Sequence, residues 1–279
     1  MNEIVKKRTL APSTKLYVVN APLVAAKAQP GQFVIVRISE NGERIPLTIA
    51  DYDADQGTLT MVFQEVGKTT KALGLLEEGD RLLDIVGPLG VPAELPTSGR
   101  VLCVGGGVGV APIYPKAKAM HRNGVEVISI IAARTKELII LEEEMRAVSS
   151  ELYIATDDGS RGFHGFANGL IKKLLDEGQH FDEIIAVGPM LMMKACVETT
   201  RPYGVKTWVS LNPIMVDGTG MCGACRVTVG KETKFSCVDG PMFDGHQVDF
   251  DEAIRRCRMY LDQERTALEA WCAHGGGCR

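Results

Sequence analysis

The stretch Val101-Leu102-Cys103-Val104-Gly105-Gly106-Gly107-Val108-Gly109-Val110-Ala111-Pro112 decides the fold of the middle of the chain. An apolar strand runs into a glycine turn, and a helix is predicted from there to about His121. A strand, a glycine turn and a helix make the dinucleotide-binding unit, which places phosphate over the helix N-terminus. The spacing departs from a strict G-x-G-x-x-G pattern. The candidate phosphate-binding residues are Gly105, Gly106, Gly107 and Gly109.

Four further alternations of an apolar strand with a helix follow this turn. Such alternation predicts a parallel, doubly wound sheet with right-handed crossovers over residues 98–212. The predicted strands are Val125–Ile131, Leu152–Thr156, Ile184–Val187 and Lys206–Val209. A helix is also predicted around Leu138–Val148, and we interpret its Glu142-Glu143-Glu144 run as a solvated face.

Three loops follow strands of this predicted sheet, at the edge where such folds bind ligands. Their candidate nucleotide-binding residues are Arg134, Asp157, Asp158, Gly159, Gly188, Pro189 and Met190. An acidic residue near the end of the second strand would favour a free ribose, but Arg134 and Lys136 stand there. Basic groups could favour a 2′-phosphate, although basic surface loops are common. The choice between NAD and NADP therefore stays open.

Residues 1–97 alternate short β-rich runs with turn signals, which is typical of an all-β barrel. The predicted strands are Lys15–Val19, Phe33–Ile38, Thr58–Phe63 and Arg81–Val86. The region contains Arg44-Ile45-Pro46-Leu47-Thr48-Ile49-Ala50, and then Gly67-Lys68-Thr69-Thr70 at the head of a helix predicted over Lys68–Leu76. Cationic groups, hydroxyls and a helix start suit a pyrophosphate. A solvated turn and a helix cap would explain either motif taken alone.

Near the C-terminal end the chain reads Asp217-Gly218-Thr219-Gly220-Met221-Cys222-Gly223-Ala224-Cys225, and Cys237 follows. This spacing is close to that of a plant-type [2Fe–2S] loop with aspartate as the first ligand. Glycines let such a loop bend sharply and turn backbone amides toward sulfur. A structural zinc site would need a second close pair after Cys237, and buried inert thiols would leave the glycines unexplained. We predict a cluster bound by Asp217, Cys222, Cys225 and Cys237.

Residues 213–279 are expected to form a third, small unit that holds this loop and a polar helix over residues 249 to about 270. The tail contains Cys272, His274 and Cys278, which could bind a metal. A glycine-rich terminus is more often frayed or held by a partner, and we favour that interpretation.

Composition narrows the function classes. The chain has 279 residues, 45% hydrophobic and 24% charged, as expected of a globular protein with about two domains and an appendage. The net charge of −4 gives no electrostatic footprint for nucleic acid. No apolar run is long enough for a signal peptide or a membrane span. Eight cysteines in a chain of this length do not suggest a disulfide scaffold, so a cytoplasmic location is expected.

In this order, R-I-P-L-T-I-A, G-K-T-T, G-G-G-V-G-V-A-P, T-D-D-G-S and V-G-P-M resemble the ferredoxin–NADP reductase superfamily. With the cysteine loop, the chain resembles to about residue 250 the branch of electron-transfer subunits that serve dihydroorotate dehydrogenase B and ferredoxin:NADP oxidoreductases. The resemblance implies an FAD-binding barrel that uses Arg44, Pro46, Leu47, Thr48, Gly67, Lys68, Thr69 and Thr70. It also implies a nicotinamide site lined by Gly105–Gly109 and Asp157-Asp158-Gly159, and a C-terminal [2Fe–2S] domain.

Two departures from the family pattern matter. Dihydroorotate dehydrogenase subunits have four cysteines at the cluster, whereas Asp217 replaces the first one here. The ferredoxin:NADP oxidoreductase branch uses an aspartate at this point, so the departure favours that branch. Many reductases also place a cysteine before the G-P of the fifth-strand loop, and Val187 stands there instead. No catalytic side chain is therefore assigned.

The resemblance implies an oxidoreductase subunit that passes hydride from NADH to FAD and single electrons to the cluster. Its expected partner is a larger subunit with a second flavin and further iron–sulfur centres, forming an electron-bifurcating heterodimer. The alternative partner is dihydroorotate dehydrogenase B. A reductase that feeds an oxygenase is disfavoured by the aspartate ligand. From another class, the chain could be a non-catalytic redox sensor or a zinc-binding protein. A visible spectrum with flavin and iron content would separate the enzyme from a zinc protein.

Overall fold

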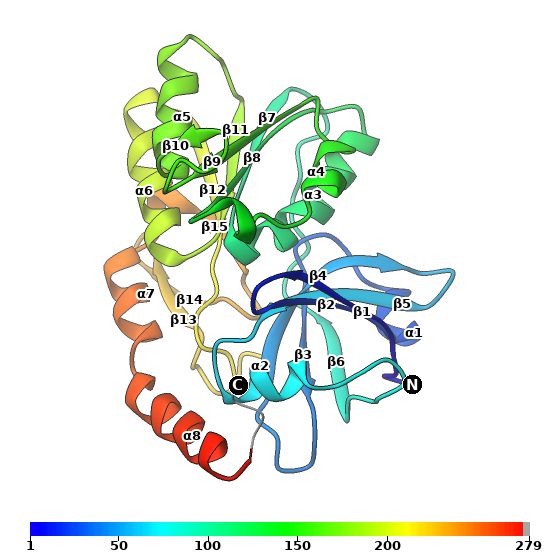
Figure 1. The fold of residues 1–279 in the computed structure, drawn as a ribbon. Helices are drawn as coiled ribbons and strands as arrows, with labels where there is room; N and C mark the ends of the chain where they lie inside the picture. Colours follow the sequence, from blue (N-terminus) through cyan, green and yellow to red (C-terminus); the bar gives the residue numbers. More distant parts are fainter. Residues whose placement is uncertain (276–279) are drawn as a thin grey trace.

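The N-terminal part of the chain forms a six-stranded antiparallel sheet, in a computed structural model that describes residues 1–275 (Figure 1). The strand order is β1-β2-β5-β4-β3-β6. Its elements are β1 (Ile4–Ala11), β2 (Thr14–Asn20), α1 (Pro22–Ala25), β3 (Phe33–Arg37), β4 (Ile45–Asp53), β5 (Thr58–Gln64), α2 (Lys68–Gly74) and β6 (Asp84–Leu89). A bridge between Glu3 and Arg81 joins the start of β1 to the segment before β6, so the sheet curls toward closure. The predicted antiparallel barrel is confirmed.

Two strands of this barrel were missing from the prediction. β1 contains the run Lys6-Lys7-Arg8, which hides its β character, and β4 carries the Arg44–Ala50 motif from Ile45 onward. Aliphatic and aromatic side chains from several strands fill the interior, among them Tyr17, Leu59 and Met61. Burial of these apolar side chains therefore stabilises the barrel, and the residue pattern of each strand taken alone shows only part of it.

The middle of the chain forms a seven-stranded sheet in the order β10-β9-β8-β7-β11-β12-β15. Its strands are β7 (Arg100–Gly106), β8 (Glu126–Ala133), β9 (Glu151–Thr156), β10 (Phe163–His164), β11 (Glu183–Val187), β12 (Lys206–Ser210) and β15 (Met242–Asp244). Its helices are α3 (Val110–Arg122), α4 (Glu142–Arg146), α5 (Ala167–Asp176) and α6 (Met190–Thr200), with 3-10 turns at Gly107–Gly109, Lys136–Leu138 and Arg201–Tyr203. All pairings are parallel except that of β15 with β12.

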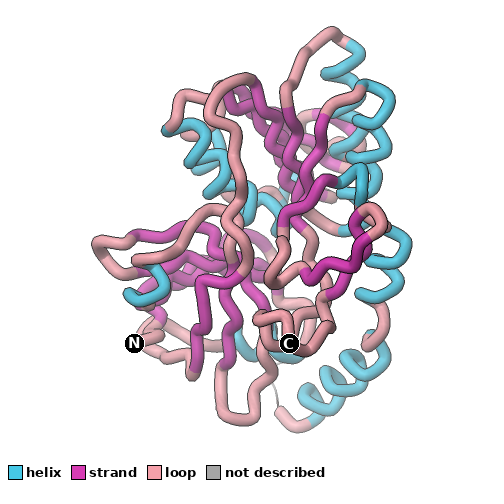
Figure 2. Tube along the Cα trace, turned by 180° about the vertical axis from the view of Figure 1, so that it is seen from behind, coloured by secondary structure: helices cyan, strands magenta, loops and turns pink. Residues whose placement is uncertain are grey.

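Helices cover both faces of this sheet (Figures 1 and 2). Because successive strand residues point to opposite faces, Val101 and Cys103 of β7 pack with α3 and α4, whereas Leu102 and Val104 pack with α5 and α6. The predicted doubly wound fold is thus confirmed, with one antiparallel edge strand added. The face that holds α3 also packs on the barrel, where Lys118 Nζ lies 2.6 Å from Asp51 Oδ2.

The predicted helix over Leu138–Val148 is wrong in its extent. Leu141 adopts a left-handed conformation with φ of 53°, so a regular helix begins only at Glu142 and ends at Arg146. Leu138 instead ends the 3-10 turn Lys136–Leu138, and Ile139 and Ile140 lie in no helix.

The C-terminal part carries a hairpin of β13 (Arg226–Val229) and β14 (Glu232–Phe235), a 3-10 turn at Gly245–Gln247, and two helices. One helix was predicted over residues 249 to about 270, but α7 (Phe250–Cys257) and α8 (Leu261–Ala273) are separate. The Asp249 carboxylate caps α7 by accepting from the Glu252 amide at 2.9 Å. Cys278 lies outside the described residues. No helix within residues 1–275 is long and apolar enough to cross a membrane.

Candidate flavin, nucleotide and iron–sulfur sites

The flavin candidates lie on β4 and at the start of α2. Arg44 is exposed just before β4, and Pro46, Leu47 and Thr48 pair with β3. Leu47 is only 8% exposed and packs into the barrel interior, so its side chain serves the core. Since side chains alternate along a strand, Pro46 and Thr48 lie on the other face, where both are half-buried.

Glu43, which the sequence analysis did not single out, joins the two flavin motifs. Its carboxylate accepts a hydrogen bond from Thr69 Oγ1, and its Oε1 lies 3.6 Å from Lys68 Nζ. The neighbouring Arg44 is thereby held near the first turn of α2. Thr70 caps this helix, because its Oγ1 accepts from the amides of Val66 at 3.0 Å and Gly67 at 3.1 Å.

These contacts test the fit of the barrel to a flavin pyrophosphate. The Lys68 ammonium and the Thr69 hydroxyl are cationic and neutral donors, both already engaged with an anionic oxygen. Phosphate oxygens would use the same donors. The residues fit an FAD phosphate, with Thr70 stabilising the helix start.

The glycine turn after β7 is shaped by close packing. A Cβ on Gly109 would overlap the carbonyl group of Val187, and one on Gly105 would come within 2.7 Å of Val110 Cα. Gly107 instead adopts a positive φ of 55°, which favours glycine. Gly105 and Gly109 therefore let β7, α3 and the end of β11 approach one another.

Met192 covers the glycine turn and was missed by the sequence analysis. Its side chain lies against Gly106 and Gly188, so a Cβ at either position would require the Met192 side chain to move. Pro189 is exposed at the start of α6, and Met190 is the first residue of that helix. The loops after β7 and β11 thus meet, as predicted, at the carboxyl ends of parallel strands.

The loops after β8 and β9 are also brought together. The amides of Asp157 and Asp158 donate to the carbonyls of Ala133 at 3.1 Å and Arg134 at 3.2 Å. Burial raises the pKa of Asp157, and Arg134 opposes that shift. Hydrogen bonds from Ser160 lower the pKa of Asp158. Two carboxylates and an exposed Arg134 therefore share one corner of the sheet edge, with Gly159 exposed at the turn between them.

The interpretation of Glu142 as part of a solvated face is wrong. Its side chain is 19% exposed, and its two carboxylate oxygens each lie 2.8 Å from a guanidinium nitrogen of Arg161. Arg146 Nη2 also donates to it at 2.9 Å. The i,i+4 spacing of Glu142 and Arg146 was visible in the sequence, but Arg161 reaches Glu142 only through the fold.

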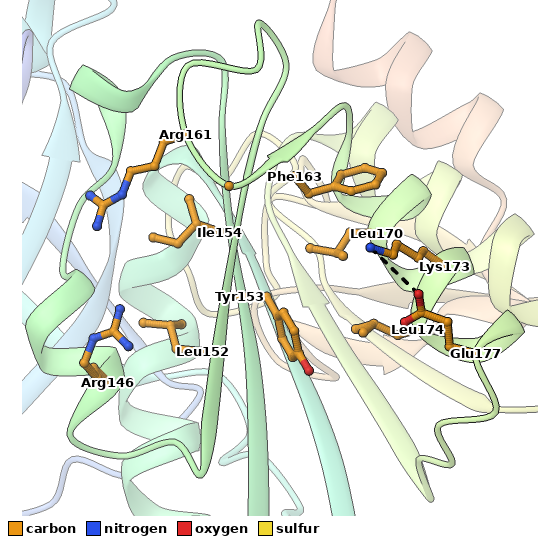
Figure 3. A pocket seen from close by; sticks show the side chains of 11 residues that line it. Arg146, Leu152, Tyr153, Ile154, Arg161, Phe163, Leu170, Lys173, Leu174 and Glu177 are labelled. Carbon is orange, nitrogen blue, oxygen red and sulfur yellow. Dashed lines mark ion pairs between the residues drawn. The ribbon is translucent and has the colours of Figure 1, made fainter.

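A cavity of about 500 Å³ lies at the outer edge of β9, away from the glycine turn (Figure 3). Leu152, Tyr153 and Ile154 all line it, although neighbouring strand residues point to opposite faces. The cavity therefore lies along the strand edge, because β10 covers only Ala155 and Thr156.

The cysteine loop packs directly on the barrel. Cys225 and Cys237, each 1% exposed, share an apolar cluster with Phe33 and Ile35 of β3, and their sulfurs are 3.2 Å apart. Gly218 has a φ of 74°, and a Cβ there would lie 2.7 Å from Leu89 Cδ1 of β6. Since β3 pairs with β4 and with β6, one strand separates this loop from the flavin motif.

Of the four predicted ligands, the structure brings two thiols together. Cys222 is exposed, and the Asp217 carboxylate accepts from the amides of Thr219 and Cys222, both at 2.8 Å. These hydrogen bonds lower the pKa of Asp217. Across residues 1–275, no three His, Cys, Asp or Glu side chains converge in a way that would hold a metal ion.

Two buried donors next to this loop test its fit to a cluster. Ser236 Oγ, beside Cys237, has no hydrogen-bond partner in the described part of the chain, and neither has Arg256 Nε of α7. Arg256 Nη2 donates to the carbonyl of Ala224, between Cys222 and Cys225, at 3.0 Å. Buried polar groups without partners are rare in folded proteins. Soft thiolates, turning glycines and unpaired donors together fit an iron–sulfur cluster.

We expect Arg256→Gln to lower the reduction potential of this cluster. A positive charge stabilises the reduced form, which carries one more electron. In a medium of effective dielectric constant near 20, a unit charge contributes about 4 kcal/mol at about 4 Å and about 1.7 kcal/mol at about 10 Å, so a shift on the order of 100 mV is expected for one electron. Redox titration followed by EPR measures the shift, and Arg255→Gln on the exposed side of the same helix is the control. Equal potentials in wild type and both variants would contradict this role.

Residues 212–249 match the family model of the iron–sulfur cluster binding domain of dihydroorotate dehydrogenase B. A dihydroorotate dehydrogenase B electron transfer subunit homolog from Thermotoga maritima is 49% identical, over 99% of this chain and 97% of that protein. The corresponding subunit from Geobacillus thermodenitrificans is 38% identical, over 88% of this chain and 96% of that protein. The chain belongs to the family of dihydroorotate dehydrogenase B electron-transfer subunits and their homologues.

Solved structures show which members of this family and which other reductases the chain resembles in three dimensions. One chain of the NADH-dependent reduced ferredoxin–NADP oxidoreductase is 49% identical to this chain, with a TM-score of 0.93, and the match covers 98% of both chains. That structure was described for its insight into flavin-based electron bifurcation. Phthalate dioxygenase reductase has 14% identity and a TM-score of 0.58, covering 81% of this chain and 85% of that one, and so shares the fold. The predicted resemblance is confirmed.

Proposed function

We propose that this chain is the electron-transfer subunit of an NADH-dependent, electron-bifurcating ferredoxin:NADP oxidoreductase. It takes hydride from NADH onto FAD and delivers single electrons to a [2Fe–2S] cluster. The observation that carries the proposal is the packing of Cys225 and Cys237 against β3, the strand that pairs with the flavin motif. The similarity to the ferredoxin–NADP oxidoreductase chain supports the same function.

The three segments divide this work. We assign residues 1–97 to FAD, 98–212 to the nicotinamide nucleotide, and 213–279 to the cluster. Arg44, Lys68 and Thr69 bind the flavin phosphates, while Thr70 and Gly67 shape the start of α2. The glycine turn and the loop after β11 line the nucleotide site with Gly105, Gly106, Gly107, Gly109, Gly188, Pro189 and Met190. Arg134 and the loop Asp157-Asp158-Gly159 contact the adenosine end.

The residues of this chain bind and orient the cofactors, and the cofactors supply the redox chemistry when bound. A flavin accepts an electron pair as hydride and can release electrons singly, which a nicotinamide does not do. The barrel and the α/β domain are fixed to one another by the apolar contacts of α3 and by the Lys118–Asp51 ion pair. No side chain is assigned to proton transfer.

We assign Asp217, Cys222, Cys225 and Cys237 to the cluster. Among the free cysteines of the described residues, Cys103 and Cys196 are buried in the α/β core, where burial raises the pKa of each thiol to about 12, and neither is assigned to a cluster. Further iron–sulfur centres then reside on a larger partner subunit in a heterodimer. The curated relatives are themselves called electron transfer subunits, which supports a partner that completes the reaction.

An anaerobic titration tests the relay. Addition of NADH to the purified holoprotein is expected to bleach the flavin absorbance and then produce the EPR signal of a reduced [2Fe–2S] cluster. NADPH is expected to act more slowly. Flavin bleaching without any cluster signal, in the presence of low-potential mediators, would contradict the relay.

Dihydroorotate dehydrogenase B is the second candidate partner, favoured by the match of residues 212–249 to its cluster-binding domain. Asp217 in the first ligand position argues for the ferredoxin:NADP oxidoreductase. Purification of the untagged complex distinguishes them, because one partner oxidises dihydroorotate and the other reduces NADP with ferredoxin.

A further inference from the structure

Glu142 holds two guanidinium groups at one edge of the nucleotide-binding domain. Its carboxylate forms a two-point contact with Arg161, at 2.8 Å for both oxygens, and accepts from Arg146 at 2.9 Å. Figure 3 shows Arg146 and Arg161 on the same side of β9, beside Leu152 and Ile154. One carboxylate thus engages both arginines, and it does so while only 19% exposed.

Arg161 belongs to the loop that follows β9, close to the corner assigned to the adenosine end. This loop contacts the loop after β8, where the amide of Lys136 donates to Ser160 Oγ at 2.8 Å. The carboxyl ends of neighbouring parallel strands are where this fold binds nucleotide. Arg161 therefore directly follows Ser160, the residue whose side chain joins the two loops at this corner.

A 2′-phosphate distinguishes NADP from NAD and is best recognised by the planar fork of an arginine. The fork of Arg161 is already engaged by Glu142. The positive charge of Arg134 interacts with the carboxylate of Asp157, which offsets part of it. The carboxylates of Asp157 and Asp158 repel a phosphate but accept hydrogen bonds from ribose hydroxyls.

We propose that Glu142 is a specificity-determining residue, which keeps the nucleotide site selective for NAD(H) by withholding Arg161 from a 2′-phosphate. This inference rests on the proposed function, since it concerns the nucleotide that the same site takes. Glu142 acts through Arg161 and does not itself contact the nucleotide.

The test is the binding of NAD⁺ and NADP⁺ to the holoprotein by isothermal titration calorimetry. In Glu142→Gln, the NADP⁺ affinity is expected to rise by roughly tenfold or more, as for one charge-assisted contact. The NAD⁺ affinity should change far less. Adding Arg161→Met to Glu142→Gln should remove the gain, and Glu143→Gln, an exposed neighbour in the same helical turn, should show none.

An unchanged ratio of the two affinities in Glu142→Gln would overturn the inference while leaving the proposed function intact. Wild-type protein that binds neither nucleotide would instead overturn the proposed function. A measurement on the wild type alone guards against a variant that fails to fold. Adenosine 2′-monophosphate should bind the wild type no more tightly than adenosine 5′-monophosphate, and tighter binding of the 2′-isomer would also overturn the inference.

Discussion

Replacing Cys225 by alanine is expected to remove the [2Fe–2S] cluster, so that iron falls from about two atoms per chain to nearly none. Cys225 is fully enclosed, with its sulfur 3.2 Å from that of Cys237. No other free cysteine of the described chain shares the apolar cluster formed by these two thiols. Iron and sulfide analysis, visible absorbance and EPR measure the loss.

Cys257→Ala is the matched control for this substitution. Cys257 lies at the end of α7 and is a free, half-buried thiol outside the predicted ligand set. Its replacement should leave the iron content unchanged. Iron retained at the wild-type level in Cys225→Ala, or lost equally in Cys257→Ala, would show that the ligands are wrongly assigned.

Replacing Lys116 by methionine is expected to stabilise the protein at pH 7 by on the order of 3 kcal/mol. Lys116 is completely buried in α3, and its ammonium donates to the carbonyl of Pro112 at 2.9 Å. Burial lowers its pKa from 10.5 to about 8. Folding therefore places a charge in an apolar interior at pH 7, a cost that methionine avoids while filling a similar volume.

The same lysine predicts how stability changes with pH. Above pH 8 the folded state releases the Lys116 proton, whereas the unfolded chain keeps it up to the ordinary lysine pKa. The unfolded state then binds more protons, so stability rises with pH. Cys103 and Cys196 oppose this rise from about pH 9, because burial raises the pKa of each thiol to about 12 while the unfolded thiols ionise. The increase should appear between about pH 8 and 9.

Urea unfolding at several pH values between 7 and 9 measures this effect. The midpoint of Lys116→Met should start higher, and the difference between it and the wild-type midpoint should narrow as the pH rises, because only the wild type gains stability from release of the lysine proton. Lys173→Met, at an exposed position of α5, serves as the control and should follow the wild type. A lower midpoint for Lys116→Met at pH 7, or the same pH dependence as the wild type, would contradict the prediction.

Local patterns were sufficient wherever a short segment fixes its own geometry. The strand, glycine turn and helix around Val101–Pro112 were predictable because apolar runs and glycines act within a dozen residues. The boundaries of Leu138–Val148 were not, because the left-handed Leu141 leaves no signature in its residue type. The two-helix form of residues 249–273 was likewise not visible in composition.

By itself, the sequence determined the antiparallel barrel, the doubly wound sheet, and the cysteine loop as the place for soft-metal chemistry. Each depends on residue types and spacings that act locally. Only the tertiary structure decided which distant residues meet: Glu43 with Lys68 and Thr69, Arg256 with Ala224, and Glu142 with Arg161. Such contacts join loops and helices separated by 19 to 32 residues. Their formation depends on the packing of whole elements, because chain direction and strand order, which no local pattern encodes, determine which side chains face one another.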